Sequence, residues 1–594
     1  MSLRTSSPPA PAAPAPARPD GVPALLETLL VVTAAVVTVV KNDPGAVADI
    51  RGTVPGNLGD PLYFAWQLAW VAHAVSTDPG SLWTTNAFSG APDNLAYTDT
   101  ILGYLPLGLL TGAGDGGQPA ALATLNAAGF VAAVLALCGG YALARALGAG
   151  PAGALVAGAG FGLAPWRVEQ AIHLNVISTG GIAFTLALLC LGHGWTLRDG
   201  WRPETMRPWA IAAGWAVACW QITLGFATGI VFGYVLAGVC LLWAIGWLRA
   251  GRPRLPRALL VAEGVGGGAF LLVTYLLTRP YLRVLERFPS AERSEAMLDL
   301  FSPPPSGLRL SSDTSWFWGE RQAADRAKLT WAPEMILSPG HVLAALAVLG
   351  LVVSVWSLRR RLLLGLATAV ATVLALGTQA VGDGEWTYLP LYRHLPGWDA
   401  LRTPGRLVLW VTLGLALLAA GFVGRLAQAL LRRAEDRGAR PVSGVRAAVG
   451  VLALALPPLL VGADGWGGPR HWPVQPAPLV VSTAPAPVMF LPTDLVGDYH
   501  LMLWSTDGWP QLANGSSGFD PPSQGKLRQD TQPFPDAASV AALRARGVRT
   551  VVLVRSRAGG TPWEQAADRP VDGLGIERLD LGDAVVYRLD RPAP

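Results

Sequence analysis

The chain has 594 residues, of which 51% are hydrophobic and only 14% charged, and its formal net charge is +5. A soluble protein has about 25% charged residues, so this composition, with its recurring long apolar runs, predicts a polytopic α-helical membrane protein. The basic residues lie mostly in short clusters between apolar runs, whereas a nucleic-acid-binding protein would gather them on one face. All four cysteines fall inside apolar runs, so we expect free thiols, with no disulfide and no cysteine-based metal site (Cys138, Cys190, Cys219, Cys240).

The chain begins with a Pro/Ala-rich stretch, 1–21, which we expect to be a disordered cytoplasmic tail. Residues 22–40 can span a membrane, and we interpret them as a retained anchor and not as a cleaved signal. Ten further spans bring the prediction to about eleven transmembrane helices (119–146, 151–165, 174–193, 207–224, 226–248, 258–278, 338–357, 362–380, 406–430 and 447–463).

Basic clusters set the predicted orientation, because Lys and Arg are enriched in cytoplasmic loops. Four such clusters agree with one another and place the N-terminus in the cytoplasm and the C-terminus outside (198–207, 249–257, 359–361, 432–446). The same alternation makes the short apolar segment 99–112 re-entrant or interfacial. Three long loops then face outward from the transmembrane domain 22–463 (41–118, 279–337, 381–405).

The last part of the chain, 464–594, has the composition of a soluble domain. Its apolar runs predict three buried strands, at 487–492, 550–556 and 584–591, and a helix at 536–547. We therefore expect a small extracytoplasmic α/β domain after the membrane helices.

One carboxylate of the first outer loop, Asp60, lies directly before a helix predicted over residues 61–75. An Asp N-cap followed by Pro61 is an ordinary helix start, so capping is one interpretation of this residue. The helix is about 22 Å long and carries Trp66 and Trp70 on one face. We expect it to lie half-sunk at the interface, where Trp is favoured, which would hold Asp60 at headgroup depth beside a lipid-borne substrate.

Two other outer segments contain ionisable candidates. Asp99 begins the segment that should dip into the membrane, and the second outer turn contains Arg167, Glu169 and His173. Ionisable residues so close to the membrane are candidates for function. Pairing between Arg167 and Glu169 is the structural alternative.

The third outer loop is basic although it faces outward. Arg393, Arg402 and Arg406 lie just before a span, against the positive-inside trend. They need an anionic partner, and a phosphate suits them because a guanidinium can bind it bidentately. Asp399 or lipid headgroups are the alternative partners.

In these segments the chain resembles the GT-C superfamily of integral-membrane glycosyltransferases. The resemblance rests on "NLGDPLYFAWQLAW" (57–70) in the first outer loop, "PWRVEQAIH" (165–173) in the second outer turn and "LYRHLPGWDALRTPGR" (391–406) in the late outer loop. Residues 499–522, followed by "LRARGVRTVVLV" (543–554), are similar to the tail domain of bacterial members without an assigned reaction. The first loop departs from the family in having no paired acidic motif such as DxD.

The resemblance implies transfer of a hexosyl or pentosyl unit from a polyprenyl-phosphate donor to a cell-envelope glycan or glycolipid on the outer face of the plasma membrane. Asp60 would be the catalytic base. Three arginines would bind the donor phosphate (Arg393, Arg402, Arg406), and a second group would line the acceptor side (Asp99, Glu169, His173).

Two other functions fit the same pattern. A flippase for lipid-linked glycans would also have many spans and phosphate-binding arginines, and a catalytically inactive GT-C-like protein would bind glycolipid alone. Long outer loops and an outer domain favour the transferase, because a transporter requires neither. No cofactor is predicted, a divalent cation stays open, and the expected partners are lipid-linked sugar, glycan acceptor and membrane lipids, with no nucleic acid.

Overall fold

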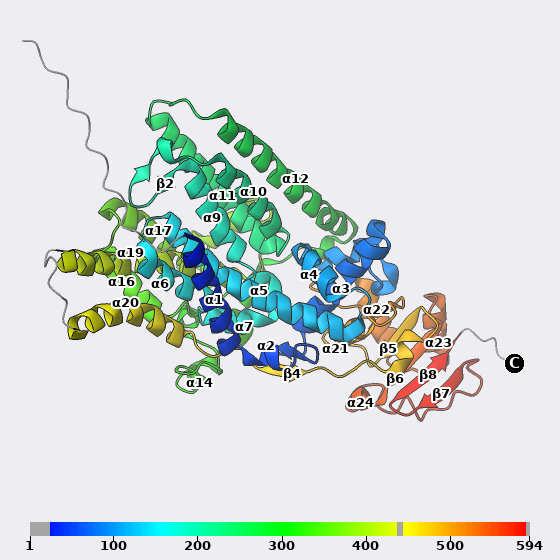
Figure 1. The fold of residues 1–594 in the computed structure, drawn as a ribbon. Helices are drawn as coiled ribbons and strands as arrows, with labels where there is room; N and C mark the ends of the chain where they lie inside the picture. The colour runs from blue at the N-terminus through cyan, green and yellow to red at the C-terminus, as the bar shows by residue number, and fades with distance from the viewer. Residues whose placement is uncertain (1–23, 436–443, 590–594) are drawn as a thin grey trace, which may run out of the picture.

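The computed structural model describes residues 24–435 and 444–589, so the expected tail at 1–21 lies outside it (Figure 1). Six helices in these ranges are long and apolar enough to cross a membrane, and the chain is a membrane protein. They are α1 (Ala24–Asn42), α5 (Gly117–Ala146), α8 and α9 (Leu174–Ile177 and Gly180–His193), α11 (Phe226–Arg249), α12 (Arg257–Arg287) and the Pro404–Arg433 segment that contains most of α19 (Val408–Glu435).

The other five expected spans also coincide with helices: α6 (Gly150–Gly162), α10 (Pro208–Ile222), α16 (His341–Val352), α17 (Leu358–Ala375) and α20 (Gly444–Asp464). The span expected at 338–357 is shorter than predicted, because α16 ends at Val352. Its 12 residues extend only about 18 Å, less than a hydrocarbon core of about 30 Å. The count of eleven complete spans therefore stays a prediction.

Helix α19 is the most buried of the six long apolar helices, since 83% of its most apolar stretch lies inside the protein. It packs closely on α6 and α16 through small residues. A Cβ on Gly153 would collide with the Ala420 carbonyl, and one on Gly350 would collide with the Leu418 carbonyl. Glycines thus let these backbones approach one another, as is common between membrane helices.

Helix α12 continues past its expected end, and the predicted loop 279–337 begins as helix. Beyond the apolar stretch, α12 holds Arg283 and Arg287, which pair with Asp93 of the first outer loop. Polar partners thus stabilise a helical extension that hydropathy alone does not predict. Three short helices fill the rest of this loop: α13 (Glu295–Phe301), α14 (Ala323–Arg326) and α15 (Ala332–Met335). Elsewhere, α18 (Tyr388–His394) lies in the expected loop 381–405, and β2 (Trp195–Thr196) and β3 (Gly200–Trp201) form a ribbon between α9 and α10.

The first outer loop holds α2 (Pro44–Ala48), β1 (Thr53–Pro55), α3 (Asp60–Thr77) and α4 (Leu105–Thr111), the last within the segment expected to be re-entrant. The expectation that the helix after Asp60 lies half-sunk at an interface is wrong, because α3 is buried around most of its circumference. It packs against α5, α4 and α21 (Gly497–Trp504). Trp66 and Trp70 donate to buried oxygens of Asn86 and Leu82, so neither indole serves as an interfacial anchor.

The C-terminal part forms a four-stranded sheet of order β5-β6-β8-β7, seen at one end of the molecule in Figure 1. Strand β5 (Val488–Leu491) runs parallel to β6 (Thr550–Val554), and β8 (Ala584–Arg588) lies antiparallel between β6 and β7 (Glu577–Leu581). The three expected strands and the expected helix correspond to β5, β6, β8 and α23 (Ala537–Ala545), whereas β7, α21, α22 (Pro522–Thr531) and α24 (Arg555–Ala558) were not expected.

A two-stranded ribbon ties the two parts together. Strand β1 pairs antiparallel with β4 (His471–Pro473), which brings Pro55 opposite His471. Together with the contact between α3 and α21, this ribbon holds the C-terminal part against the first outer loop.

Candidate functional site

The site is centred on Asp60 in the first turn of α3, where Gly59 and not Asp60 is the N-cap. Asp60 Oδ2 lies 2.9 Å from Nε2 of His173, which follows α7 (Trp166–Glu169) and a short 3₁₀ turn. The Asp60 side chain is 41% exposed and the His173 side chain only 11%. The second oxygen of Asp60, Oδ1, accepts no hydrogen bond from the described part of the chain.

Gln170 determines which nitrogen of His173 carries a proton. The Gln170 amide donates through Nε2 to the Pro333 carbonyl (2.6 Å) and to Glu334 Oε2 (3.2 Å), and both are acceptors only. Its Oε1 therefore faces His173 Nδ1, at 2.8 Å, so Nδ1 is the donor. His173 Nε2 faces Oδ2 of Asp60, so this contact fixes the orientation of the carboxylate relative to the imidazole ring.

Glu334, on α15, joins this pair to an arginine. Arg406 donates from Nη2 to Glu334 Oε1 (2.5 Å) and from Nε to Oε2 (3.2 Å), and Oε1 lies 3.7 Å from His173 Nε2. Burial raises the pKa of the Glu334 carboxyl, but Arg406 and His173 outweigh it and lower that pKa to about 2. Glu334 is thus ionised at neutral pH and neutralises Arg406.

Two further arginines, Arg402 and Arg293, have no neutralising carboxylate among the described residues. Arg402 contacts Met297 Sδ at 3.8 Å and lies over the Phe301 ring, and no carboxylate lies within 4 Å of it in the described ranges. Burial and the charge of Arg406 lower the pKa of Arg402, while Asp60 and Glu334 act in the opposite direction. Arg293 donates to the Gly518 carbonyl at 3.0 Å, and burial together with Arg402 lowers its pKa to about 10.

An aromatic contact connects the C-terminal part to the Asp60 site. Tyr63, one turn after Asp60 on α3, packs on Tyr499 of α21 with ring centroids 5.4 Å apart. Burial, with the charge of Asp60 adding to it, raises the pKa of both phenols, so both are neutral O–H groups. The loop after α21 contributes Ser517 beside Tyr63.

Asp99 is held by hydrogen bonds at the start of α11, and its expected place on the acceptor side stays a prediction. It accepts from the backbone N–H groups of Phe226 (2.5 Å) and Ala227 (3.3 Å) at the start of α11, and from Asn175 Nδ2 (2.9 Å). Burial raises the pKa of Asp99, and these three donors oppose that shift. Asp99 therefore anchors α11 to the segment that carries His173.

Two other candidates lie apart from the Asp60 cluster. Glu169 faces Ser312 and the neighbourhood of Arg326, so it pairs neither with Asp60 nor with Arg167, and burial raises its pKa. Arg393 is half-exposed on α18 and forms ion pairs with Glu295 (2.7 Å) and Glu385 (2.8 Å).

Four residues of the site were missed from the sequence: Gln170, Glu334, Arg293 and Tyr499. Gln170 lies three residues before His173, a spacing that could have indicated it. Glu334 pairs across 72 residues with Arg406, and no local pattern marks such a partner.

Metal chemistry has little support from the donor set. In residues 24–435 and 444–589, no three His, Cys, Asp or Glu side chains are placed to share a metal ion. All four cysteines are free, as expected.

No protein-family model and no curated protein matches the chain. Several solved structures resemble it over most of its length. The oligosaccharyltransferase AglB from Archaeoglobus fulgidus, in complex with an inhibitory peptide and a dolichol-phosphate, is 15% identical over 95% of this chain and 74% of that one, with a TM-score of 0.43. ArnT from Cupriavidus metallidurans in the apo state is 14% identical over 94% and 97%, with a TM-score of 0.44. ArnT bound to undecaprenyl phosphate is 13% identical over 96% and 98%, with a TM-score of 0.35. Both proteins are GT-C superfamily membrane glycosyltransferases.

Proposed function

We propose that the protein is a membrane glycosyltransferase that moves a sugar from a polyprenyl-phosphate donor to a hydroxyl of a glycan or glycolipid acceptor. One observation carries the proposal. A half-exposed carboxylate, Asp60, lies in one site with a partly buried arginine, Arg402, that has no carboxylate partner in the described chain. A base and a vacant phosphate-binding group are the two parts that this reaction needs.

On the acceptor side, Asp60 Oδ1 accepts the proton of the attacking hydroxyl. His173 holds Oδ2 and so orients the carboxylate, while Gln170 and Glu334 orient His173. The acceptor oxygen bonds to the anomeric carbon as the bond from that carbon to the phosphate oxygen breaks. The proton ends on Asp60, and the leaving group departs as polyprenyl phosphate.

On the donor side, Arg402 and Arg293 bind the phosphate and stabilise the charge that develops on it as it leaves. Arg406 acts differently, because Glu334 already neutralises it, and we assign it to positioning Glu334 and His173. Arg393 is left out of the donor site, since Glu295 and Glu385 occupy its guanidinium.

The C-terminal part, over its described residues 464–589, forms a wall of the site in this proposal. Tyr499 packs on Tyr63 beside Asp60, and Arg293 is held by the Gly518 carbonyl. The positions of the basic clusters support an extracytoplasmic site in the plasma membrane, with a cytoplasmic N-terminus. The hydroxyl groups of Tyr63, Tyr499 and Ser517 near Asp60 can exchange hydrogen bonds with the hydroxyls of a glycan acceptor.

The test is a transfer assay with purified protein in liposomes. Polyprenyl-phosphate hexoses and pentoses labelled in the sugar are presented with cell-envelope glycolipid. We expect label to enter the glycolipid and free polyprenyl phosphate to appear in equal amount, since one bond is exchanged for another. Label that crosses the bilayer while still attached to polyprenyl phosphate would show a flippase, and binding without release would show an inactive glycolipid-binding protein.

A further inference from the structure

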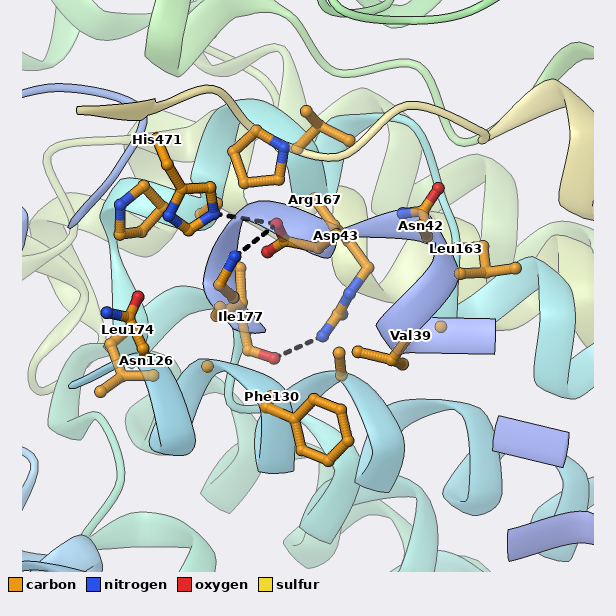
Figure 2. Close-up of a pocket in the computed structure, with 18 of the residues that line it drawn as sticks. Val39, Asn42, Asp43, Asn126, Phe130, Leu163, Arg167, Leu174, Ile177 and His471 are labelled. Carbon is orange, nitrogen blue, oxygen red and sulfur yellow. Dashed lines mark hydrogen bonds and ion pairs between the residues drawn. The ribbon is translucent and has the colours of Figure 1, made fainter. Parts of the chain in front are cut away.

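A cavity of about 110 Å³ lies beside the ribbon of β1 and β4, between the end of α1, the first half of α5 and the segment 162–177 (Figure 2). Its lining is mostly apolar, with Val39, Leu125, Phe130, Leu163 and Leu174 among the wall residues. A cavity of about 150 Å³ can admit benzene, so this one can hold a group of a few heavy atoms, with the rest of a larger ligand outside it. It is much larger than a single water requires, about 10–15 Å³.

A histidine at this cavity has an unused nitrogen. His471 Nε2 lies 2.8 Å from Asp43 Oδ1, drawn as a dashed line in Figure 2, and its side chain is only 8% exposed. Within the described ranges its Nδ1 is buried without a hydrogen-bond partner. A hydroxyl satisfies this nitrogen whether or not Nδ1 is protonated, because a hydroxyl both donates and accepts.

A second polar group at the cavity is the buried guanidinium of Arg167. It donates to the Ile177 carbonyl (2.5 Å) and to Thr179 Oγ1 (3.1 Å), which leaves three of its five N–H donors without a hydrogen bond to the described part of the chain. No carboxylate lies within 4 Å of Arg167 in the part of the chain that the structure describes, although its side chain is nearly buried. A buried cation without a counter-ion favours an anionic ligand.

The cavity is distinct from the Asp60 site, although one segment borders both. Arg167, Ala171 and Leu174 line the cavity, whereas Gln170 and His173 of the same segment bond to the Asp60 cluster. The cavity also lies at the same end of α1 as Asn42 and Asp43, beside helices that are apolar enough to cross a membrane.

We propose that this cavity binds the phosphoglycerol headgroup of an anionic membrane lipid. The phosphate faces Arg167, and a glycerol hydroxyl bonds to Nδ1 of His471. The acyl chains lie outside the cavity along α1 and α5. A lipid fits better than a free anion because most of the wall is apolar and two membrane helices form it.

A glycine at the wall offers a direct test. Gly129 of α5 lines the cavity, and a Cβ built on it meets no atom within 4 Å. A leucine there would fill the cavity, and Leu is a better helix former than Gly. Gly238 of α11 is the matched control, because a Cβ on it also meets nothing within 4 Å and it does not line this cavity.

Native mass spectrometry of the full chain, without any sugar donor, measures the binding of dioleoyl phosphatidylglycerol, dioleoyl phosphatidylcholine and dioleoylglycerol. We expect the protein to bind phosphatidylglycerol about tenfold more tightly than the other two, as one good polar contact implies. Gly129→Leu should abolish this preference and Gly238→Leu should keep it. His471→Phe should reduce phosphatidylglycerol binding to the level of phosphatidylcholine, whereas His394→Phe on the exposed end of α18 should not.

Three results would overturn the proposal: equal binding of all three lipids, full phosphatidylglycerol binding by Gly129→Leu, or dioleoylglycerol bound as tightly as phosphatidylglycerol. The first would show no headgroup selection, the second would place the site elsewhere, and the third would show that Arg167 meets no phosphate. None of them bears on the transferase activity.

Discussion

Two charged networks of this protein both contain aspartate and arginine side chains, but they differ in how many of their polar atoms have partners within the protein. In the C-terminal part, Asp498 is completely buried and Arg528 bridges it to Asp520, at 3.0 and 2.7 Å. The carboxylate of Asp498 also accepts from Thr493 and Asn514. In the other network, the Asp60 side chain is 41% exposed, and among the described residues it bonds to the side chain of His173 alone, while Arg402 has no carboxylate partner there.

The comparison shows that buried charge alone does not mark a functional site. The Asp498 network stabilises its loop through its own contacts and leaves little capacity for a ligand. In the Asp60 network, Gln170 and Glu334 hold His173 in place. Asp60 Oδ1 and the Arg402 guanidinium remain available to a substrate. Polar atoms without a hydrogen-bond partner, on side chains that other contacts hold in place, are therefore a better indicator of binding or catalysis than buried charge.

The largest expected effect is a loss of sugar transfer on substitution in the Asp60 network. Asp60→Asn should lower sugar transfer by about 10²–10⁴-fold, since it removes the general base. The free energy of unfolding should change by less than about 1 kcal/mol because the side chain is half-exposed. The transfer assay in liposomes measures this loss. Asp115→Asn is the control: Asp115 is 87% exposed and also lies near a histidine, 3.8 Å from His73. Equal activity of Asp60→Asn and the unaltered protein would remove Asp60 from the mechanism.

The second expected effect is on stability. Asp498→Ala should destabilise the C-terminal part by about 3 kcal/mol, because it breaks a buried ion pair and leaves Arg528 with Asp520 alone. Hydrogen exchange of the β5 and β6 amides in the full chain should accelerate about 100-fold. Asp572→Ala, at an exposed turn, should leave exchange unchanged. Unaltered exchange in Asp498→Ala would mean that the network adds nothing to folding, and the contrast with Asp60 would disappear.

The smallest expected effect compares two arginines of one loop. Arg402→Gln should raise the KM for the polyprenyl-phosphate sugar by about 10–100-fold, the value of a hydrogen bond between charged groups. Arg393→Gln should stay within about twofold, because Glu295 and Glu385 already occupy that guanidinium. Donor titrations of both variants measure the difference. If Arg393→Gln had the larger effect, the donor phosphate would bind on the opposite side of the loop from the one we propose.

Local sequence pattern determined much of the fold. Apolar runs predicted the positions of eleven helices, and shorter apolar runs predicted β5, β6 and β8. The same runs could not predict which helices cross completely, as α16 shows, because length and flanking contacts decide it. Nearly uniform apolarity around the helix after Asp60 was compatible with burial on every side, which the C-terminal part brings about through α21.

The sequence also singled out Asp60, His173, Arg402 and Arg406, since charges beside apolar segments are conspicuous. Only the tertiary structure decided their partners. It joined Asp60 to His173 across 113 residues and Arg406 to Glu334 across 72, and it placed Glu169 and Arg393 elsewhere. The physical reason is range: periodicity reflects contacts within a few residues, whereas hydrogen bonds and ion pairs form between whichever groups the packed helices bring within about 3 Å.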